Sequence, residues 1–181
     1  MTQRIYSIPF DRSYWVIPGR LLAGAYPGSQ DPLEAGLKLT SLLECGIIQV
    51  INLMEEGERG HFGEPFAPYE EPLTVAAEKL GVEVFVIRKA IKDVSVPSPN
   101  AMKMILDEID RSIDQGRPVY VHCWGGRGRT GTVVGCYLVR HGLTGREALE
   151  QIGFLRRNEA TGDLPSPQTE TQINMVLSWK E

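Results

Sequence analysis

A ten-residue segment between His122 and Gly131 combines residue types that suit phosphate chemistry; it reads HCWGGRGRTG. Cys123 stands six positions before Arg129, and three of the residues between them are glycines. The apolar residues 118–121 before the segment are typical of a short buried strand, and the apolar residues after it recur at helical spacing. The sequence therefore predicts a glycine-rich loop at the N-terminus of a helix.

Such a loop can bind an anion. The first N–H groups of a helix have no partners inside the helix, and the helix dipole places partial positive charge there. Glycines let successive N–H groups turn inward, and the guanidinium of Arg129 can bind two phosphate oxygens at once. We expect the phosphate to be bound by Trp124, Gly125, Gly126, Arg127, Gly128 and Arg129.

Cys123 lies at the mouth of this positive field, which predicts a thiolate at neutral pH and a nucleophile for phosphoryl transfer. Two other interpretations compete. A cysteine after a buried strand is more often an inert apolar residue. The glycines 126, 128 and 131 also match a dinucleotide-binding fingerprint, but no acidic residue ends a second strand about 20 positions later. A nucleotide P-loop is disfavoured because no Lys-Ser/Thr pair follows.

The pattern His-Cys-x5-Arg-Thr-Gly resembles the signature loop of the cysteine-dependent protein tyrosine phosphatase superfamily, and the short chain resembles its dual-specificity branch. Residues 15–21 and 24–28 look like the opening strands of that branch, so the resemblance covers about residues 14–179. Asp93 lies 30 residues before Cys123, about where the family carries its general acid. A phosphatase mechanism is therefore expected.

The resemblance implies a role for each side chain. Cys123 would attack phosphorus and form a phosphocysteine, while Arg129 stabilises the phosphoryl oxygens. Asp93 would act first as the acid and then as the base. Thr130 would donate a hydrogen bond to the sulfur of Cys123. This chemistry needs neither a cofactor nor a metal.

Two further residues are expected to support the loop. His122 would hold it through hydrogen bonds of its ring. Gln172 loosely resembles a glutamine that positions water in some members of the superfamily, although Gln168 is an alternative for that position.

The expected substrate is a phosphorylated protein or a small phosphomonoester. The segment around Asp93 lacks the Trp-Pro-Asp sequence of tyrosine-specific members, which predicts a shallower pocket and a protein tyrosine or dual-specificity phosphatase. Arg127 occupies a position where a lipid phosphatase of the superfamily carries a lysine, so a phosphoinositide or inositol phosphate phosphatase is the alternative. This alternative gains support from basic residues that could lie nearby, namely Arg88, Lys89, Lys92, Arg156 and Arg157.

Other protein classes can also use such a loop. A non-catalytic phosphate-reading module usually loses the nucleophile, the arginine or the acid, and all three are present in this chain. A sulfurtransferase or an arsenate reductase could also use a cysteine and an arginine, but the late position of the loop and the upstream acid favour a phosphatase.

Composition indicates how many domains the chain forms and which classes of protein are unlike it. The 181 residues, of which 42% are hydrophobic and 23% charged, predict one catalytic domain over residues 1–181. A net charge of −4 argues against nucleic-acid binding. No apolar run approaches a membrane span, and the polar residues Met1–Arg4 do not resemble a secretory signal, so a cytoplasmic protein is expected. Three cysteines without Cys-x-x-Cys spacing indicate no zinc site and no disulfide framework. The oligomeric state is left open.

Strands and helices alternate along the chain. This alternation predicts a single-domain, three-layer α/β sandwich in which helices cover both faces of a mostly parallel sheet. The order of the strands is implied by the resemblance alone. After the opening strands, the sequence predicts a helix from Asp31 to Gly46, a strand over 47–53, a loop over 54–69 and a helix over 71–80. A strand over 82–87, a loop over 90–97 that carries Asp93, and a helix from Ser98 to Gly116 are predicted next. The helix that follows the glycine-rich loop runs to about His141, a further helix runs from the capping box Thr144–Glu147 to Leu155, and a short terminal helix is predicted near Val176 and Trp179.

Overall fold

The computed structural model describes residues 6–181; the Met1–Arg4 segment, which the expectation about a secretory signal concerns, lies outside the described residues. One sheet has the strand order β1-β2-β5-β3-β4. β1 and β2 pair antiparallel, and every other neighbouring pair is parallel. The strands are β1 (Ser13–Ile17), β2 (Leu21–Gly24), β3 (Gln49–Asn52), β4 (Phe85–Arg88) and β5 (Val119–His122).

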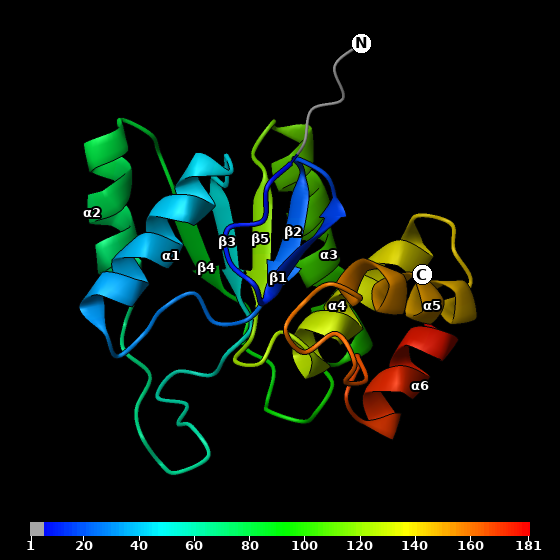
Figure 1. Ribbon diagram of the computed structural model, residues 1–181. Helices are drawn as coiled ribbons and strands as arrows, with labels where there is room; N and C mark the ends of the chain where they lie inside the picture. Colours follow the sequence, from blue (N-terminus) through cyan, green and yellow to red (C-terminus); the bar gives the residue numbers. More distant parts are fainter. Residues whose placement is uncertain (1–5) are drawn as a thin grey trace.

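Helices cover both faces of this sheet (Figure 1). α1 (Pro32–Glu44) and α2 (Glu70–Leu80) contact each other on one face. The other face carries a larger group of helices, in which α4 contacts α3, α5 and α6. These helices are α3 (Pro99–Asp114), α4 (Gly128–Arg140), α5 (Gly145–Arg156) and α6 (Glu170–Ser178). The predicted three-layer sandwich with a mostly parallel sheet is confirmed.

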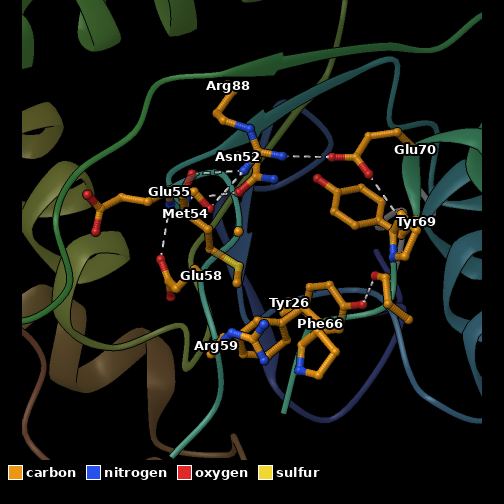
Figure 2. A pocket seen from close by; sticks show the side chains of 14 residues that line it. Tyr26, Asn52, Met54, Glu55, Glu58, Arg59, Phe66, Tyr69, Glu70 and Arg88 are labelled. Carbon is orange, nitrogen blue, oxygen red and sulfur yellow. Dashed lines mark hydrogen bonds and ion pairs between the residues drawn. The ribbon is translucent and has the colours of Figure 1, made fainter. Parts of the chain in front are cut away.

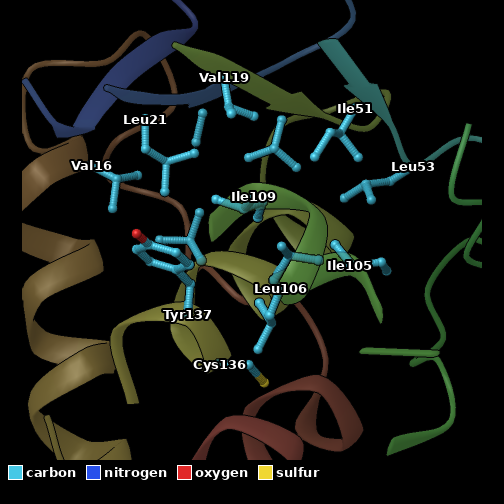
Figure 3. Close-up of a cluster of buried hydrophobic side chains, with 14 of the residues drawn as sticks. Val16, Leu21, Ile51, Leu53, Ile105, Leu106, Ile109, Val119, Cys136 and Tyr137 are labelled. Carbon is cyan, nitrogen blue, oxygen red and sulfur yellow. The ribbon is translucent and has the colours of Figure 1, made fainter. Parts of the chain in front are cut away.

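Alternating side chains of the central strands supply two separate cores. Val119 and Val121 of β5 are buried with α3 and α4, whereas Tyr120 between them is buried with α1 and α2. Figure 3 shows the larger core, where Ile109 of α3 lies between the sheet and α4. Cys136 is fully buried in this core, and burial raises the pKa of its thiol to about 12. Cys136 is therefore a packing residue.

Helix caps place most boundaries where the sequence predicts them. The side chain of Asp31 accepts a hydrogen bond from the Leu33 N–H at the start of α1, and Ser98 caps α3 in the same way. The capping box of Thr144 and Glu147 is present at α5. A second capping box, at Thr169, starts α6. β4 begins later than predicted, because residues 82–84 of the predicted strand do not pair with β3.

Parallel pairing brings the carboxyl ends of three strands to one edge of the sheet. His122 at the end of β5 lies opposite Gly24 of β2 and Asn52 of β3. Ligands of open α/β sheets bind at this edge, beyond the carboxyl ends of the strands. The glycine-rich loop therefore emerges at the position where the fold is best able to build a site.

Candidate active site

The loop over residues 124–127 bends tightly between β5 and α4. Gly126 has a φ of 72°, and a Cβ atom added there would lie 2.7 Å from the backbone of Gly24 and of Ala25. The loop backbone thus rests directly on the end of β2, and a glycine is required at this position. A Cβ atom at Gly125 would meet only the Nη2 atom of Arg12, at 3.7 Å.

Cys123 lies at the start of this loop with 2% of its surface exposed. The predicted hydrogen bond is present, because the Oγ1 atom of Thr130 donates to the Sγ atom of Cys123 over 3.1 Å. Within residues 6–181, no carbonyl or side chain accepts a hydrogen bond from the backbone N–H groups of residues 124–129. The loop therefore presents free N–H donors and a sulfur atom at the N-terminus of α4, the combination that an anion site requires.

Arg129 is buried, with 1% of its surface exposed, and its terminal nitrogens are held by acceptors. Glu58 binds it through both carboxylate oxygens, over 2.6 Å to Nη1 and 2.7 Å to Nη2. Nη1 also donates to the carbonyl of Ile91, and Nη2 lies 3.0 Å from the Oδ1 atom of Asp93. The Nε atom, in contrast, is buried and has no partner within the described residues. One guanidinium N–H thus remains available to a ligand.

Asp93 lies in the loop after β4, and the structure brings it to the same cavity as Cys123. This cavity of about 190 Å³ also contains Trp124, Gly125, Arg127, Gly128 and Arg129 in its wall. The predicted nucleophile, arginine and acid thus line one cavity, although Asp93 precedes Cys123 by 30 residues in the sequence. Val94, the residue after Asp93, has a φ of 51°, a left-handed conformation that strains a β-branched residue.

The two candidate glutamines are placed differently. Gln168 lies in the wall of the cavity, whereas Gln172 is fully buried and does not line it. The Oε1 atom of Gln172 accepts from the N–H groups of Gln168 and Thr169, and its Nε2 atom donates to the carbonyl of Ser95. Gln172 therefore caps α6 and ties it to the loop that carries Asp93. Of the two glutamines, Gln168 is the one that faces the cavity.

The buried ring of His122 supports the start of the loop through hydrogen bonds between uncharged groups. Its Nε2 atom lies 2.6 Å from the hydroxyl of Tyr69, and its Nδ1 atom lies 3.2 Å from the carbonyl of Cys123. Complete burial lowers the pKa of His122 to about 3, while burial raises the pKa of Tyr69 well above its ordinary value. The ring is therefore neutral, with Nδ1 donating to Cys123 and Nε2 accepting from Tyr69. The expected ring hydrogen bonds are present, and Tyr69 is a partner that the sequence does not reveal.

The structure pairs two of the basic residues that could lie near the cavity, and it adds a third to the cavity wall. Arg156 is buried and paired with Glu159 at 2.6 Å. Arg88 pairs with Glu70 in a neighbouring pocket whose wall includes Glu58 (Figure 2). Arg12, which precedes β1, lies in the wall of the cavity although nothing in its sequence context indicates this.

Residues 6–181 hold neither a cluster of metal ligands nor a membrane-spanning helix. No three side chains among their His, Cys, Asp and Glu residues gather closely enough to ligate a metal ion. None of their helices combines the length and the apolar character needed to cross a membrane.

The chain matches one family of protein domains and several known proteins. The family described as "Swiss Army Knife protein, DSP-PTPase phosphatase domain" matches residues 11–175. The zebrafish "Protein tyrosine phosphatase domain-containing protein 1" is 30% identical over 171 residues, which are 93% of this chain and 22% of that protein. The Arabidopsis thaliana "Phosphatidylglycerophosphate phosphatase PTPMT1" is 33% identical over 123 residues, which are 67% of this chain and 30% of that protein. This chain thus spans less than a third of either relative.

Solved structures share the fold. The crystal structure of Tk-PTP in the active form superimposes with a TM-score of 0.65 and 29% sequence identity, over 92% of this chain and 93% of that one. The structural likeness therefore extends over most of the chain.

The contact between the loop and β2 predicts a sharp difference between adjacent glycines. Gly126→Ala should lower the affinity for inorganic phosphate at least about 10-fold and destabilise the fold by about 2 kcal/mol, because the new methyl group meets backbone atoms in a left-handed conformation. Gly125→Ala is the matched control and should change both quantities little. The measurements are urea unfolding and the rise in melting temperature with phosphate. Equal behaviour of the two variants would contradict the contact.

The buried neutral His122 predicts a loss of stability in acid. Its pKa of about 3 lies below the ordinary value of 6.5, so the folded state resists protonation. The free energy of unfolding should be unaffected by this group above pH 6.5 and should fall, by about 1.4 kcal/mol per pH unit, as the pH drops from 6.5 toward 3. Urea unfolding across this range should show a shallower fall for His122→Asn than for the wild type, and parallel curves would refute the assignment.

Proposed function

Because this chain belongs to the dual-specificity branch of the cysteine-dependent protein tyrosine phosphatase superfamily, we propose that it hydrolyses phosphomonoesters through a phosphocysteine formed on Cys123. One arrangement carries this proposal: Cys123, Asp93 and Arg129, whose Nε atom has no partner within the described residues, line a single cavity at a helix N-terminus. Nucleophile, charge stabiliser and acid are thus within reach of one bound phosphoryl group.

In the first step the sulfur of Cys123 attacks phosphorus. The S–P bond forms while the P–O bond to the leaving group breaks, and Asp93 gives its proton to the departing oxygen. In the second step a water molecule attacks the phosphocysteine and gives a proton to Asp93. The S–P bond then breaks and inorganic phosphate leaves, while the hydroxyl of Thr130 stabilises the returning thiolate through its 3.1 Å hydrogen bond.

Arg129 acts on the phosphoryl oxygens through the part of its guanidinium that Glu58 leaves free. Glu58 fixes the plane of the group by binding both terminal nitrogens, so the Nε–H has a defined direction. The backbone N–H groups of residues 124–129 supply the remaining donors. Donors fixed before the reaction stabilise developing charge without reorganising, which is the main source of rate in phosphoryl transfer.

Asp93 and the phosphate share Arg129. The carboxylate of Asp93 lies 3.0 Å from Nη2 of that arginine. Arg129 thus places the acid beside the phosphoryl group that it binds.

The substrate class we propose first is a phosphorylated protein, with phosphotyrosine and phosphoserine or phosphothreonine both admitted. The cavity is small, at about 190 Å³, and Asp93, at its wall, is half exposed, so no deep cleft selects for the length of tyrosine. The zebrafish relative is named for a protein tyrosine phosphatase domain. We also propose a cytoplasmic location, because a reducing compartment keeps the thiol of Cys123 unoxidised.

Two substitutions test this mechanism. Cys123→Ser should lower the turnover of para-nitrophenyl phosphate at least about 1,000-fold, because a hydroxyl replaces the thiolate. Asp93→Asn should lower the turnover of phenyl phosphate about 100-fold, and should affect para-nitrophenyl phosphate less, because a good leaving group needs little protonation. Asp114→Asn, at the exposed end of α3, is the control for loss of a carboxylate.

Two results would refute the mechanism. Full activity of Cys123→Ser would exclude the phosphocysteine. A wild-type protein that binds phosphate but turns over no phosphomonoester would indicate the non-catalytic phosphate reader.

The bidentate ion pair of Glu58 with Arg129 predicts that Glu58 also affects the catalytic rate. Glu58→Gln should lower kcat/KM for an aryl phosphate about 10-fold or more, because one charged partner of a buried guanidinium is lost and its plane is no longer fixed. Glu56→Gln, on the same loop but exposed, is the matched control and should stay within about 2-fold of the wild type. Similar rates for both variants would show that Arg129 is oriented without Glu58.

A further inference from the structure

Hydrogen bonds to the carbonyls of the glycine-rich loop set the direction of its N–H groups. The peptide bonds of this loop are trans, so each C=O points opposite to the N–H that follows it. The Nδ1 atom of His122 donates to the carbonyl of Cys123 over 3.2 Å, which directs the N–H of Trp124 the other way. The N–H of Tyr26 donates to the carbonyl of Trp124 over 3.0 Å and directs the N–H of Gly125 in the same manner. Each donor outside the loop thus orients one peptide group.

Side chains from two other segments orient two further peptide groups of the loop. The Nη2 atom of Arg12 donates to the carbonyl of Gly125 over 3.0 Å. The Oγ atom of Ser166 donates to the carbonyl of Arg127 over 2.9 Å. The N–H groups of the two following residues therefore point away from these donors. Arg12 precedes β1 and Ser166 lies between α5 and α6, so neither is a neighbour of the loop in the sequence.

The backbone of Arg12 and its charge are both held by other parts of the protein. The carbonyl of Arg12 accepts a hydrogen bond from the N–H of Ala25 over 2.9 Å, which fastens the residue beside the end of β2. Glu159, which pairs with Arg156, also interacts with Arg12: burial raises the pKa of Glu159, and the charges of Arg156 and Arg12 lower it. The charge of Arg12 is thus met in part by a carboxylate of the protein, and its bond to the loop needs no ligand.

The segment between α5 and α6 binds Arg127 through both its backbone and its side chain. Ser166 donates to the carbonyl of Arg127, and the Nε atom of Arg127 donates to the carbonyl of Pro165 over 3.2 Å. Burial and two neighbouring arginines lower the pKa of this guanidinium, whereas the carboxylates of Glu159 and Asp163 raise it. The end of the loop is therefore fixed to this segment at two points.

Ser166 contacts the loop without forming part of the cavity. Its hydroxyl lies against the first turn of α4, where Gly131 leaves room for it, because a Cβ atom at Gly131 would meet the Oγ atom of Ser166. Arg12 is part of the cavity wall, but Ser166 lies outside that wall. A substitution at Ser166 therefore acts on a bound phosphate through the loop and not by direct contact.

We propose that Arg12 and Ser166 are positioning residues, which hold the peptide groups after Gly125 and Arg127 with their N–H groups directed at the reacting phosphoryl group. This inference rests on the proposed phosphatase activity and adds residues to its site. Rotation of such a peptide group would turn a carbonyl, with its partial negative charge, toward the phosphate oxygens. Donors fixed before the reaction stabilise charge without reorganising, so loss of either side chain lowers both the rate and the affinity for phosphate.

The first test compares two serines that make the same kind of hydrogen bond. Ser166→Ala should lower the affinity for inorganic phosphate and kcat/KM for para-nitrophenyl phosphate about 10-fold each. Ser178→Ala is the matched control and should change neither, because the Oγ atom of Ser178 also donates to a backbone carbonyl, that of Asn174, over 2.7 Å. Phosphate affinity is taken from the rise in melting temperature with phosphate, and urea unfolding verifies that each variant is folded. Equal values for the two variants would overturn the proposal.

The second test distinguishes an action of Arg12 on the loop from a contact with the substrate. Arg12→Met keeps an apolar stem without a donor and should lose about 10-fold in phosphate affinity. It should lose the same factor in kcat/KM on phenyl phosphate, para-nitrophenyl phosphate and a phosphotyrosyl peptide, because all three carry the same phosphoryl group. Arg12→Lys keeps a donor and should recover part of the loss. Arg157→Met is the control, since the Nη1 atom of Arg157 donates to the carbonyl of Phe154 over 2.6 Å. A loss confined to the peptide would overturn the positioning role.

Failure of this proposal can be told apart from failure of the proposed function. Phosphate affinity is measured without turnover, so its loss in Ser166→Ala supports the positioning role even if no phosphomonoester is hydrolysed. Cys123-dependent turnover of para-nitrophenyl phosphate, with unchanged phosphate affinity in Ser166→Ala and Arg12→Met, would overturn the positioning role and leave the phosphatase activity standing. Should Arg12→Met not fold, Arg12→Lys and Ser166→Ala give the same decision.

Discussion

A charged guanidinium enclosed by protein is the constraint on which the site depends. Arg129 has lost nearly all contact with water, so its charge must be met by acceptors, and these come from two separate loops. Glu58 reaches it from the segment after β3, and Ile91 and Asp93 reach it from the segment after β4. Through one side chain of α4, two irregular segments acquire fixed positions around Cys123. The loss of Arg129 would therefore release the walls of the cavity as well as its charge.

The aromatic residues beneath the loop are held by hydrogen bonds between uncharged groups, and not by ion pairs. Tyr69, His122 and Tyr120 are buried and uncharged, and His122 has a hydrogen-bond partner at each ring nitrogen. Tyr120 stacks on His122 at 5.5 Å between ring centroids, and its hydroxyl donates to the carbonyl of Ala25. Neutral groups with satisfied hydrogen bonds hold one arrangement without adding charge below the anion site. Tyr69, His122 and Tyr120 thus add no charge of their own beneath the loop.

Local patterns in the sequence predicted the elements and the reactive loop, because caps, strand residues and the Cys123–Arg129 spacing act over short distances. Asp31, Ser98 and Thr144 start their helices as predicted, and Thr130 makes the predicted bond to the nucleophile. Glu58, Arg12 and Tyr69 were not predicted. Each lies in or beside an irregular segment and reaches the site only after chain folding, so its sequence neighbours carry no signal. The choice between Gln168 and Gln172 likewise required the actual turn before α6.

The position of β5 in the middle of the sheet constrains how a growing chain can fold. β5 lies between β2 and β3, yet it follows both of them, and β4 as well, in the sequence. Until residue 122 has been synthesised, the β1–β2 hairpin and the β3–β4 pair have no strand to join them, and each presents an open edge of apolar residues. In a nascent chain whose β5 is still inside the ribosome, these open strand edges can therefore pair wrongly. The reactive Cys123 emerges together with β5, the strand that closes the sheet.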